Sequence, residues 1–423
     1  MANDHFVDDN ESPYHQNRSY GYFSLFIISI IYILNYLDRQ LLAVLAEPIK
    51  NDLHLSDSQL GLLTGTLFAL FYTALGLPVA WLADRTHRVR LIAVACSIWS
   101  AFTAMTGLAT NFTHVAFARV GSAVAEAGGV SPSYSLISDL FPVHKRGAAI
   151  ALFNFGMPLG LAGGVAYGAF MTENFGWRSA FLWLGVPGVL LSIALPLLVK
   201  EPRRGQNEEN ADVGLASLSQ TILTFVRDRN LRFLLIGGIF SAFIHYALLI
   251  WTPVFLMRVQ GMSLNEMAAF YSPAIGFAVA GGGLMSGVVF DRLLKRTNQA
   301  YALLSSVSAL LALPAFLLGV SANSWELGVI FLTIAQFFTG MFVAPIMAVV
   351  LNSFPPAQRS TACATLLLVL TLVAMGLGPL FIGGVSDLAG TAYGKQSLRI
   401  AMYALIPFFL IAGGINYRSP KFA

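Results

Sequence analysis

Charged residues and cysteine are scarce in this sequence. Asp, Glu, Lys and Arg make up 11% of its 423 residues, whereas a soluble globular protein usually carries about 25%. This composition excludes a soluble enzyme, a nucleic-acid-binding module and a secreted disulfide scaffold. The two cysteines, Cys96 and Cys363, lie in apolar runs without the spacing of metal ligands, so they predict neither a disulfide nor a metal site.

Short motifs of enzymes and pumps are also absent from the sequence. It has no Gly-x-Ser-x-Gly turn, no His-Glu-x-x-His zinc pair and no nucleotide-binding loop. We therefore predict no enzymatic activity, no cofactor and no bound metal. An ion gradient, and not a nucleotide, is then the expected energy source for any transport. A membrane sensor is disfavoured because no soluble output domain is long enough to signal.

Hydrophobic residues, in contrast, make up 56% of the chain. A helix needs about 20 apolar residues to cross a bilayer, so this content is enough for about a dozen crossings. We predict an all-α polytopic membrane protein with twelve transmembrane helices in two pseudo-symmetric six-helix bundles. The apolar runs lie near 20–46, 58–82, 90–110, 114–134, 147–171, 177–199, 232–256, 264–290, 299–320, 325–350, 359–386 and 398–416.

A hydrophilic stretch from Lys200 to Gln220 divides these runs into six and six, and an amphipathic segment follows it up to Asn230. The predicted organisation is a disordered tail (1–19), a first bundle (20–199), a linker with the amphipathic segment (200–230), a second bundle (231–417) and a short tail (418–423).

The distribution of basic residues predicts the orientation in the membrane. The loops on the side of the termini carry 17 Lys and Arg residues, and those on the opposite side carry 5. Because basic loops remain in the cytoplasm, both termini are expected there, in the inner membrane if the protein is bacterial. The basic residues therefore indicate topology, and we predict no nucleic-acid partner.

The two halves of the sequence repeat one another. The pairs Asp84-Arg85 and Asp291-Arg292 are 207 residues apart, as are Ser56 and Ser263. Two repeats in the same orientation imply a pseudo-two-fold axis along the membrane normal, with a cavity between the bundles and alternating access by rocking. A third anchor, at an offset of 213, pairs Phe141-Pro142 and Arg146 with Phe354-Pro355 and Arg359.

Several motifs resemble those of a known family. The segments LADRTHRVR (82–90) and GMPLG (156–160) resemble signatures of the major facilitator superfamily. Within that superfamily the chain resembles the spinster-like lipid transporters, in their bacterial type. This resemblance implies a monomeric lipid transporter whose first, fourth, seventh and tenth helices line a cavity. The motifs specific to that group are NYLDRQ (35–40), Glu126 with SLISDLFP (135–142), and GWRSAF with KEPRRG (176–205).

Four ionisable side chains lie inside the predicted membrane helices: Asp38, Arg119, Glu126 and His245. Such groups are expensive in hydrocarbon and mark transport pathways. A carboxylate that gains or loses contact with Arg119 changes its proton affinity, so we predict that Asp38 and Glu126 exchange protons. Arg119 is expected to be their counter-ion or an anchor for an anionic headgroup. His245 is also predicted to take part in proton coupling, because a histidine titrates near neutral pH. The alternatives are a permanent structural ion pair and, for His245, hydrogen-bonded packing.

The polar residues on the presumed cavity helices are unevenly divided. A cavity that is charged on one wall and mostly apolar on the other suits an amphiphile, such as a lysophospholipid or sphingoid-type lipid. The alternative is a proton-coupled transporter of small organic anions or drugs. The predicted substrate-binding residues are Tyr32, Asn35, Tyr36, Arg119 and Ser122 in the first half, and Tyr246, Trp251 and Gln336 in the second.

A further set of charged residues lies in the loops on the terminal side. In the superfamily that the motifs resemble, the Asp of the loop between the second and third helices contacts the start of the eleventh helix, where the helix dipole favours a negative charge. We predict a latch that stabilises the outward-facing state. Its members are Asp84, Arg85, Arg88, Asp139, Arg146 and Arg359.

Overall fold

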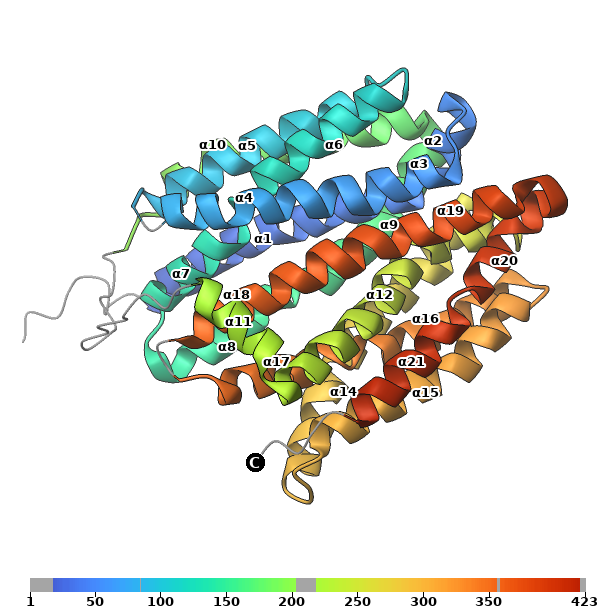
Figure 1. Cartoon of the computed structure of the whole chain (residues 1–423). Coiled ribbons are helices and arrows are strands. Elements are labelled where there is room, and N and C mark those ends of the chain that lie inside the picture. Colours follow the sequence, from blue (N-terminus) through green and yellow to red (C-terminus); the bar gives the residue numbers. More distant parts are fainter. Residues whose placement is uncertain (1–17, 84, 203–217, 356–357, 419–423) are drawn as a thin grey trace, which may run out of the picture.

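The structure is a computed structural model, in which residues 18–83, 85–202, 218–355 and 358–418 are described (Figure 1). Nearly all of the predicted tails, part of the predicted linker, and Asp84 of the predicted latch lie outside the described residues.

Helices form almost all of the first half of the chain. Their starts and ends lie within a few residues of the predicted apolar runs. In order they are α1 (Arg18–Val44), α2 (Ala46–Leu53), α3 (Asp57–Gly61), the π-helical turn η1 (Leu62–Thr66), α4 (Leu67–Ala83), α5 (Arg88–Thr106), α6 (Phe112–Glu126), α7 (Val130–Leu140), α8 (Val143–Asn154), α9 (Gly156–Phe175) and α10 (Trp177–Leu198).

The second half follows the same plan, and the described residues include no strand. A short amphipathic helix precedes it, where such a segment is predicted. The elements are α11 (Leu218–Arg227), α12 (Arg229–Arg258), α13 (Leu264–Glu266), η2 (Met267–Tyr271), α14 (Ser272–Leu294), α15 (Ala300–Ser321), α16 (Trp325–Gly340), α17 (Val343–Ser353), α18 (Arg359–Val369), η4 (Leu370–Met375), α19 (Gly376–Tyr393), η5 (Gly394–Gln396), α20 (Ser397–Tyr403) and α21 (Ile406–Tyr417).

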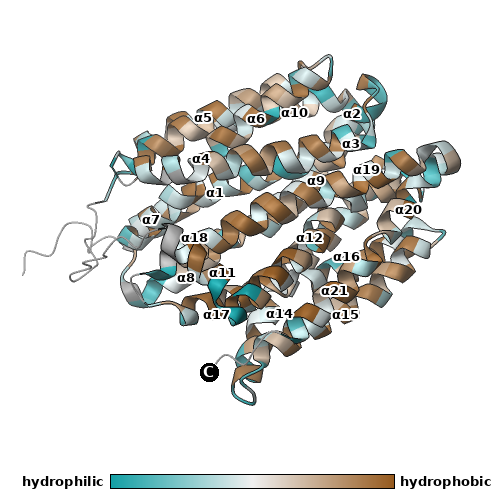
Figure 2. Cartoon of the chain, viewed as in Figure 1, coloured by the Kyte–Doolittle hydropathy of each residue, from teal (hydrophilic) through white to brown (hydrophobic). Residues whose placement is uncertain are grey.

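Ten stretches of the described residues are long and apolar enough to cross a membrane. One of them, Thr361–Tyr417, is 57 residues long and contains two of the predicted crossings. The remaining crossing is made of α6 and α7, each too short to qualify alone because the helix is interrupted at residues 127–129. The prediction of a twelve-helix fold is therefore confirmed. Figure 2 shows hydrophobic colours along the helices and hydrophilic colours gathered near their ends.

The local structure of the two halves reproduces the sequence repeat. Ser56 and Ser263 each cap a helix, and each forms a reciprocal capping box with the residue three positions later, Gln59 and Glu266. A π-helical turn follows in both cases. These matched details arise because equivalent positions of the two repeats carry equivalent capping residues.

The two halves contact each other closely at the ends opposite the termini. There α19 lies along α3 and η1, and Figure 1 shows it between the first-half helices and α12. Two glycines allow this approach, because a Cβ at Gly61 would collide with the Pro379 carbonyl and one at Gly383 with the Asp57 carbonyl. The space between the two halves is therefore closed at this end of the molecule.

Candidate functional site

Four charged side chains form two ion pairs in the middle of the first half. On α1, the Nε of Arg39 donates to Glu126 Oε2 at 2.7 Å. Beside it, Arg119 Nη1 lies 3.9 Å from Asp38 Oδ2. Asp38, Arg119 and Glu126 are only 4%, 5% and 0% exposed, so the charges are removed from water. The cluster is neutral overall, and this balance is what makes its burial tolerable.

Aromatic rings surround the two guanidinium groups. Arg39 lies 4.5 Å from the ring centroid of Phe68 and 4.9 Å from that of Tyr72, both on α4. Arg119 lies 4.4 Å from the ring of the same Phe68. The fully buried Phe68 thus contacts both cations, and attraction between cation and ring faces helps to hold them in a poorly hydrated site.

The Thr103 hydroxyl on α5 is placed to serve Asp38 in either charge state. It lies 2.9 Å from Asp38 Oδ1 and 3.0 Å from the Trp99 carbonyl oxygen. Because a hydroxyl has one proton and two lone pairs, it can donate to an ionised Asp38. It can equally donate to Trp99 while accepting from a protonated Asp38.

Each member of the cluster keeps a polar atom that has no hydrogen-bond partner among the described residues. The atoms are Asp38 Oδ2, Arg39 Nη2, Arg119 Nε and Glu126 Oε1. A buried polar group without a partner costs about 1–3 kcal/mol, and more if it is charged. The arrangement therefore has capacity for further ligands, which a purely structural pair of salt bridges would not need.

Arg39 is the member of this cluster that the sequence-based prediction missed. The prediction placed Asp38 or Glu126 next to Arg119. In the structure Arg119 lies beside Asp38, and Glu126 forms its ion pair with Arg39. The signal was present, since Arg39 is a charge inside an apolar run and part of NYLDRQ. The rule that selected Asp38 applies equally to its neighbour.

His245 lies in a hydrogen-bonded position between α12 and α16. Its Nδ1 is 3.1 Å from Gln336 Nε2 and 3.3 Å from the Thr339 hydroxyl, and the ring is buried. The described contacts of His245 include no carboxylate. This environment is the one expected for the packing alternative of His245. The side-chain amide of Gln336 is engaged in the same contact.

The other predicted substrate-binding residues differ in accessibility. Trp251 is fully buried and donates its ring N–H to the Pro379 carbonyl oxygen at 2.9 Å, so it joins α12 to α19 and leaves no surface for a ligand. Tyr36 and Tyr246 are half-buried. Tyr32, Asn35 and Ser122 are buried in the first half.

Arg88 and Asp139, two residues of the predicted latch, lie together in the first half, and Arg88 also binds the start of the predicted linker. The Arg88 guanidinium pairs with Asp139 at 2.5 Å and with Glu201 at 2.6 Å. Arg146 donates to the Ser138 carbonyl oxygen.

The remaining latch residues also have local contacts. Arg85 stacks on Trp81, and Arg359 donates to the Phe354 carbonyl oxygen. Arg85, Arg88, Asp139 and Arg146 belong to the first half of the chain, and Arg359 begins α18 in the second half.

The closed end contains an ion-pair network that was not predicted. Arg258 of the second half donates to both carboxylate oxygens of Asp57, at 2.6 and 2.9 Å, and to Glu47 at 2.8 Å. Lys50 also binds Asp57 at 2.5 Å. Asp387 of α19 accepts from the backbone N–H of Asp57 at 2.8 Å. These charges lie in helices near their ends, where sequence alone predicts ordinary solvated residues.

No three His, Cys, Asp or Glu side chains come together as metal ligands in the part of the chain that the structure describes. The buried cluster brings together two carboxyl groups, a type of group that can bind a proton, and two guanidinium groups, a type that can bind an anion.

The family of the chain follows from comparison with known proteins. A family model described as the Major Facilitator Superfamily matches residues 28–321. The chain therefore belongs to the Major Facilitator Superfamily, and it is a multi-pass membrane transporter and not an enzyme.

A solved structure narrows this assignment. It is described as a bacterial homologue of the human lysosomal transporter Spinster, in an inward-facing and unoccupied conformation. The TM-score is 0.85 at 29% sequence identity, over 95% of this chain and 97% of that one. The predicted resemblance to spinster-like transporters is confirmed.

Two relatives have other descriptions. An MFS-type efflux pump of Mycolicibacterium smegmatis is 30% identical over 411 residues, covering 97% of this chain and 95% of the relative. A probable galactarate/D-glucarate transporter of Bacillus subtilis is 26% identical, covering 96% of this chain and 94% of the relative. Transport is common to the three descriptions, and among them only that of the Bacillus subtilis protein names a substrate.

Proposed function

We propose that this protein is a proton-coupled secondary transporter that moves an amphipathic lipid, such as a lysophospholipid or a sphingoid-type lipid, by alternating access. Asp38 and Glu126 exchange protons during the cycle, with Arg119 and Arg39 as their counter-ions. The transporter works as a monomer and uses no cofactor.

The observation that carries this proposal is the buried pair of ion pairs with unused hydrogen-bonding capacity. In a poorly hydrated site, protonation of one carboxyl leaves its arginine uncompensated. The freed arginine then attracts another anion, such as the phosphate of a lipid headgroup. Proton uptake and binding of an anionic headgroup are therefore coupled by charge balance.

The side of the cluster that faces the second half is apolar and aromatic. Tyr246 of α12 and Met375 of η4 pack against Phe68, Tyr72 and their neighbours in one hydrophobic cluster. The second half thus offers rings and a thioether where the first half offers charge. This division suits a headgroup on one wall and an acyl chain on the other.

We further propose that the residues 20–199 and 231–417 move as two units, with both termini in the cytoplasm. The ion-pair network of Arg258 closes the outer end, so the conformation described here is inward-facing. In the outward-facing state the outer network breaks, and the latch of Asp84, Arg88 and Arg146 with the start of α18 closes the inner end.

The test uses purified protein in proteoliposomes with a trapped pH dye. Addition of a lysophospholipid should move protons in the wild type, and Asp38→Asn or Glu126→Gln should reduce this signal at least tenfold. Asp52→Asn is the matched control, because Asp52 is an exposed carboxylate paired with Arg178. Coupling that is unchanged in both Asp38→Asn and Glu126→Gln would refute the proton mechanism.

Transport of small organic anions is the second candidate. It is supported by the similarity to the Bacillus subtilis sugar-acid transporter, and a bare carboxylate could bind the same arginines. Proton movement driven by small anions, without competition from single-chain lipids, would select this substrate class and retain the carboxylate mechanism.

A further inference from the structure

A small cavity lies beside Asp38, on the side of α1 that packs within the first half. Its polar lining consists of Asp38, Arg119, Ser122 and Thr106, from α1, α6 and α5, and Val115 and Phe181 contribute apolar walls. The cavity has about 10 Å³ of room for the centre of a water molecule. That is about what one ordered water requires.

The unpaired atoms of the ion pair belong to the residues that line this cavity. Asp38 Oδ2 and Arg119 Nε have no hydrogen-bond partner among the described residues. The contact between the two side chains, 3.9 Å, is too long for a hydrogen bond. A polar contact of that length between buried groups is commonly bridged by water.

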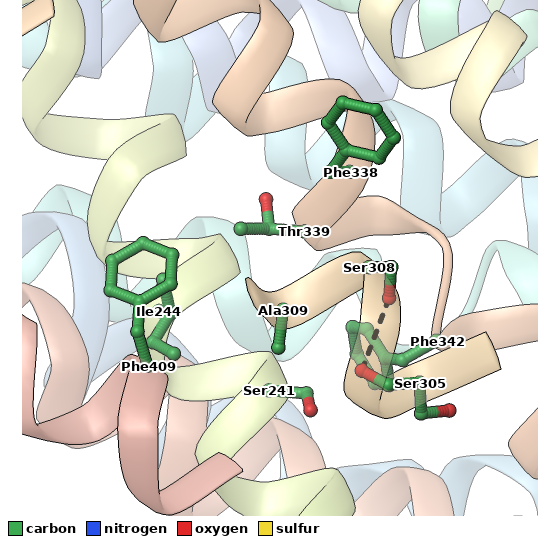
Figure 3. Close-up of a pocket in the computed structure, with 9 residues that line it drawn as sticks. All are labelled: Ser241, Ile244, Ser305, Ser308, Ala309, Phe338, Thr339, Phe342 and Phe409. Carbon is green, nitrogen blue, oxygen red and sulfur yellow. Dashed lines mark hydrogen bonds between the residues drawn. The ribbon is translucent and has the colours of Figure 1, made fainter. Parts of the chain in front are cut away.

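A cavity of the same size lies in the second half (Figure 3). It is formed by α12, α15, α16 and α21, the counterparts in the repeat of α1, α5, α6 and α10. Its lining is neutral, with the hydroxyls of Ser241, Ser305, Ser308 and Thr339 among apolar side chains. The Ser308 hydroxyl donates to the Ser305 carbonyl oxygen (Figure 3). Each half thus has a water-sized cavity between the same four helices of the repeat, at different positions along them, and only the first-half cavity is lined by ionisable groups.

We propose that one ordered water molecule occupies the first-half cavity and bridges Asp38 to Arg119. It accepts a hydrogen bond from Arg119 Nε and donates one to Asp38 Oδ2, and the hydroxyls of Thr106 and Ser122 complete its partners. This proposal deepens the proposed function, on which its role in coupling rests.

The bridging water lets Asp38 change charge while Arg119 stays in place. When Asp38 is ionised, the water donates to the carboxylate. When Asp38 is protonated, the water rotates and accepts from the carboxyl O–H, while Arg119 keeps its own bond to the water. A direct contact between Arg119 and Oδ2 could not accommodate a proton on Oδ2, because an arginine can only donate. The other charges that act on Asp38 are Glu126 and Arg39.

Filling the cavity tests the proposal. Val115→Ile adds one methylene, about the space of the water, and leaves every polar group in place. Ser122→Ala removes a hydrogen-bond partner of the water without adding volume. This variant tests the proposal if Val115→Ile does not fold. The matched control is Ser308→Thr, which adds one carbon beside the neutral cavity of the second half.

The first readout is the pH dependence of lysophospholipid-driven proton movement in proteoliposomes. Loss of one hydrogen bond to the charged carboxylate should raise the midpoint in Val115→Ile by about one pH unit, a tenfold change in proton affinity. Ser122→Ala should shift it in the same direction by a smaller amount, and Ser308→Thr should leave it unchanged. The second readout is water density between Asp38 and Arg119 in an experimental structure, present in the wild type and absent in Val115→Ile.

The outcomes separate this proposal from the proposed function. An unshifted midpoint in both first-half variants, while Asp38→Asn abolishes proton movement, would overturn the water bridge and leave proton coupling intact. An equal shift in Ser308→Thr, or an empty cavity in the wild type, would also overturn it. If Asp38→Asn alone retains coupling, the role of the water in coupling fails while Glu126 still carries the proposed function. If both Asp38→Asn and Glu126→Gln retain coupling, the proposed function fails as well.

Discussion

Replacing Arg258 by Gln should open the outer end of the transporter. The Arg258 side chain is 7% exposed and makes three charge-assisted hydrogen bonds across the interface between the halves, two to Asp57 and one to Glu47. Removing one partner of a buried ion pair costs about 3–5 kcal/mol. Lys50 and the Ser386 hydroxyl still bind Asp57 in the variant, so the lower value applies.

The free-energy cost of Arg258→Gln applies only to the conformation that is closed at this end. Once the halves separate at this end, water solvates the charges, and the substitution has little effect on the free energy of the open state. A difference of about 3 kcal/mol changes the ratio of closed to open molecules roughly 100-fold. We therefore expect a transporter that is mostly closed at its outer end to become substantially open there.

The assay is a distance measurement between spin labels at the exposed positions Asn51 and Lys395, one in each half, with Cys96 and Cys363 replaced beforehand. The Arg258→Gln variant should gain a population at longer distance.

Arg178→Gln is the matched control for Arg258→Gln. Its ion pair with Asp52 is 2.6 Å long but lies within the first half, with side chains 39% and 43% exposed. Such surface pairs contribute about 0–1 kcal/mol, so the control should match the wild type. Identical distance distributions in Arg258→Gln and the wild type would show that this network does not set the conformational equilibrium.

Two further predictions concern packing. Gly383→Val should also open the outer end, because the new side chain would collide with the Asp57 carbonyl. Gly384→Val should not, since a Cβ there meets nothing closer than 4.0 Å. The same distance measurement compares the two variants, and equal behaviour would refute the steric explanation. His245→Gln should keep the transport rate within about twofold of the wild-type rate and leave the pH profile of transport unchanged, because an amide can retain the hydrogen bonds to Gln336 and Thr339. A shifted pH profile in the proteoliposome assay would show that His245 takes part in proton coupling.

The charged cluster could be predicted only in part from the sequence. Asp38, Arg119 and Glu126 stand out because charges inside apolar runs are rare. The pairing of Arg39 with Glu126 depends on how α1 and α6 are rotated against each other, which spacing along one helix does not reveal. The location of Phe68 between two guanidiniums depends on α4 as well.

The outer network shows the limit of sequence reasoning more plainly. Asp57 and Arg258 are 201 positions apart and lie at helix ends, Asp57 at the start of α3 and Arg258 at the end of α12, where charges are ordinary. Trp251 is a second example: it is predicted to bind substrate, and in this structure its ring N–H donates to the α19 backbone, a partner that the sequence does not reveal.

The amino-acid sequence by itself determined the membrane fold, the twelve helices, their repeat in two halves and the presence of buried charge. These features are local, since they follow from the length and composition of each apolar run and from capping residues at its ends. Only the tertiary structure decided which charges pair, which end is closed, and which polar side chains are already occupied. Those outcomes depend on the packing of helices that are far apart in the chain, where shifts of an ångström decide whether a hydrogen bond forms.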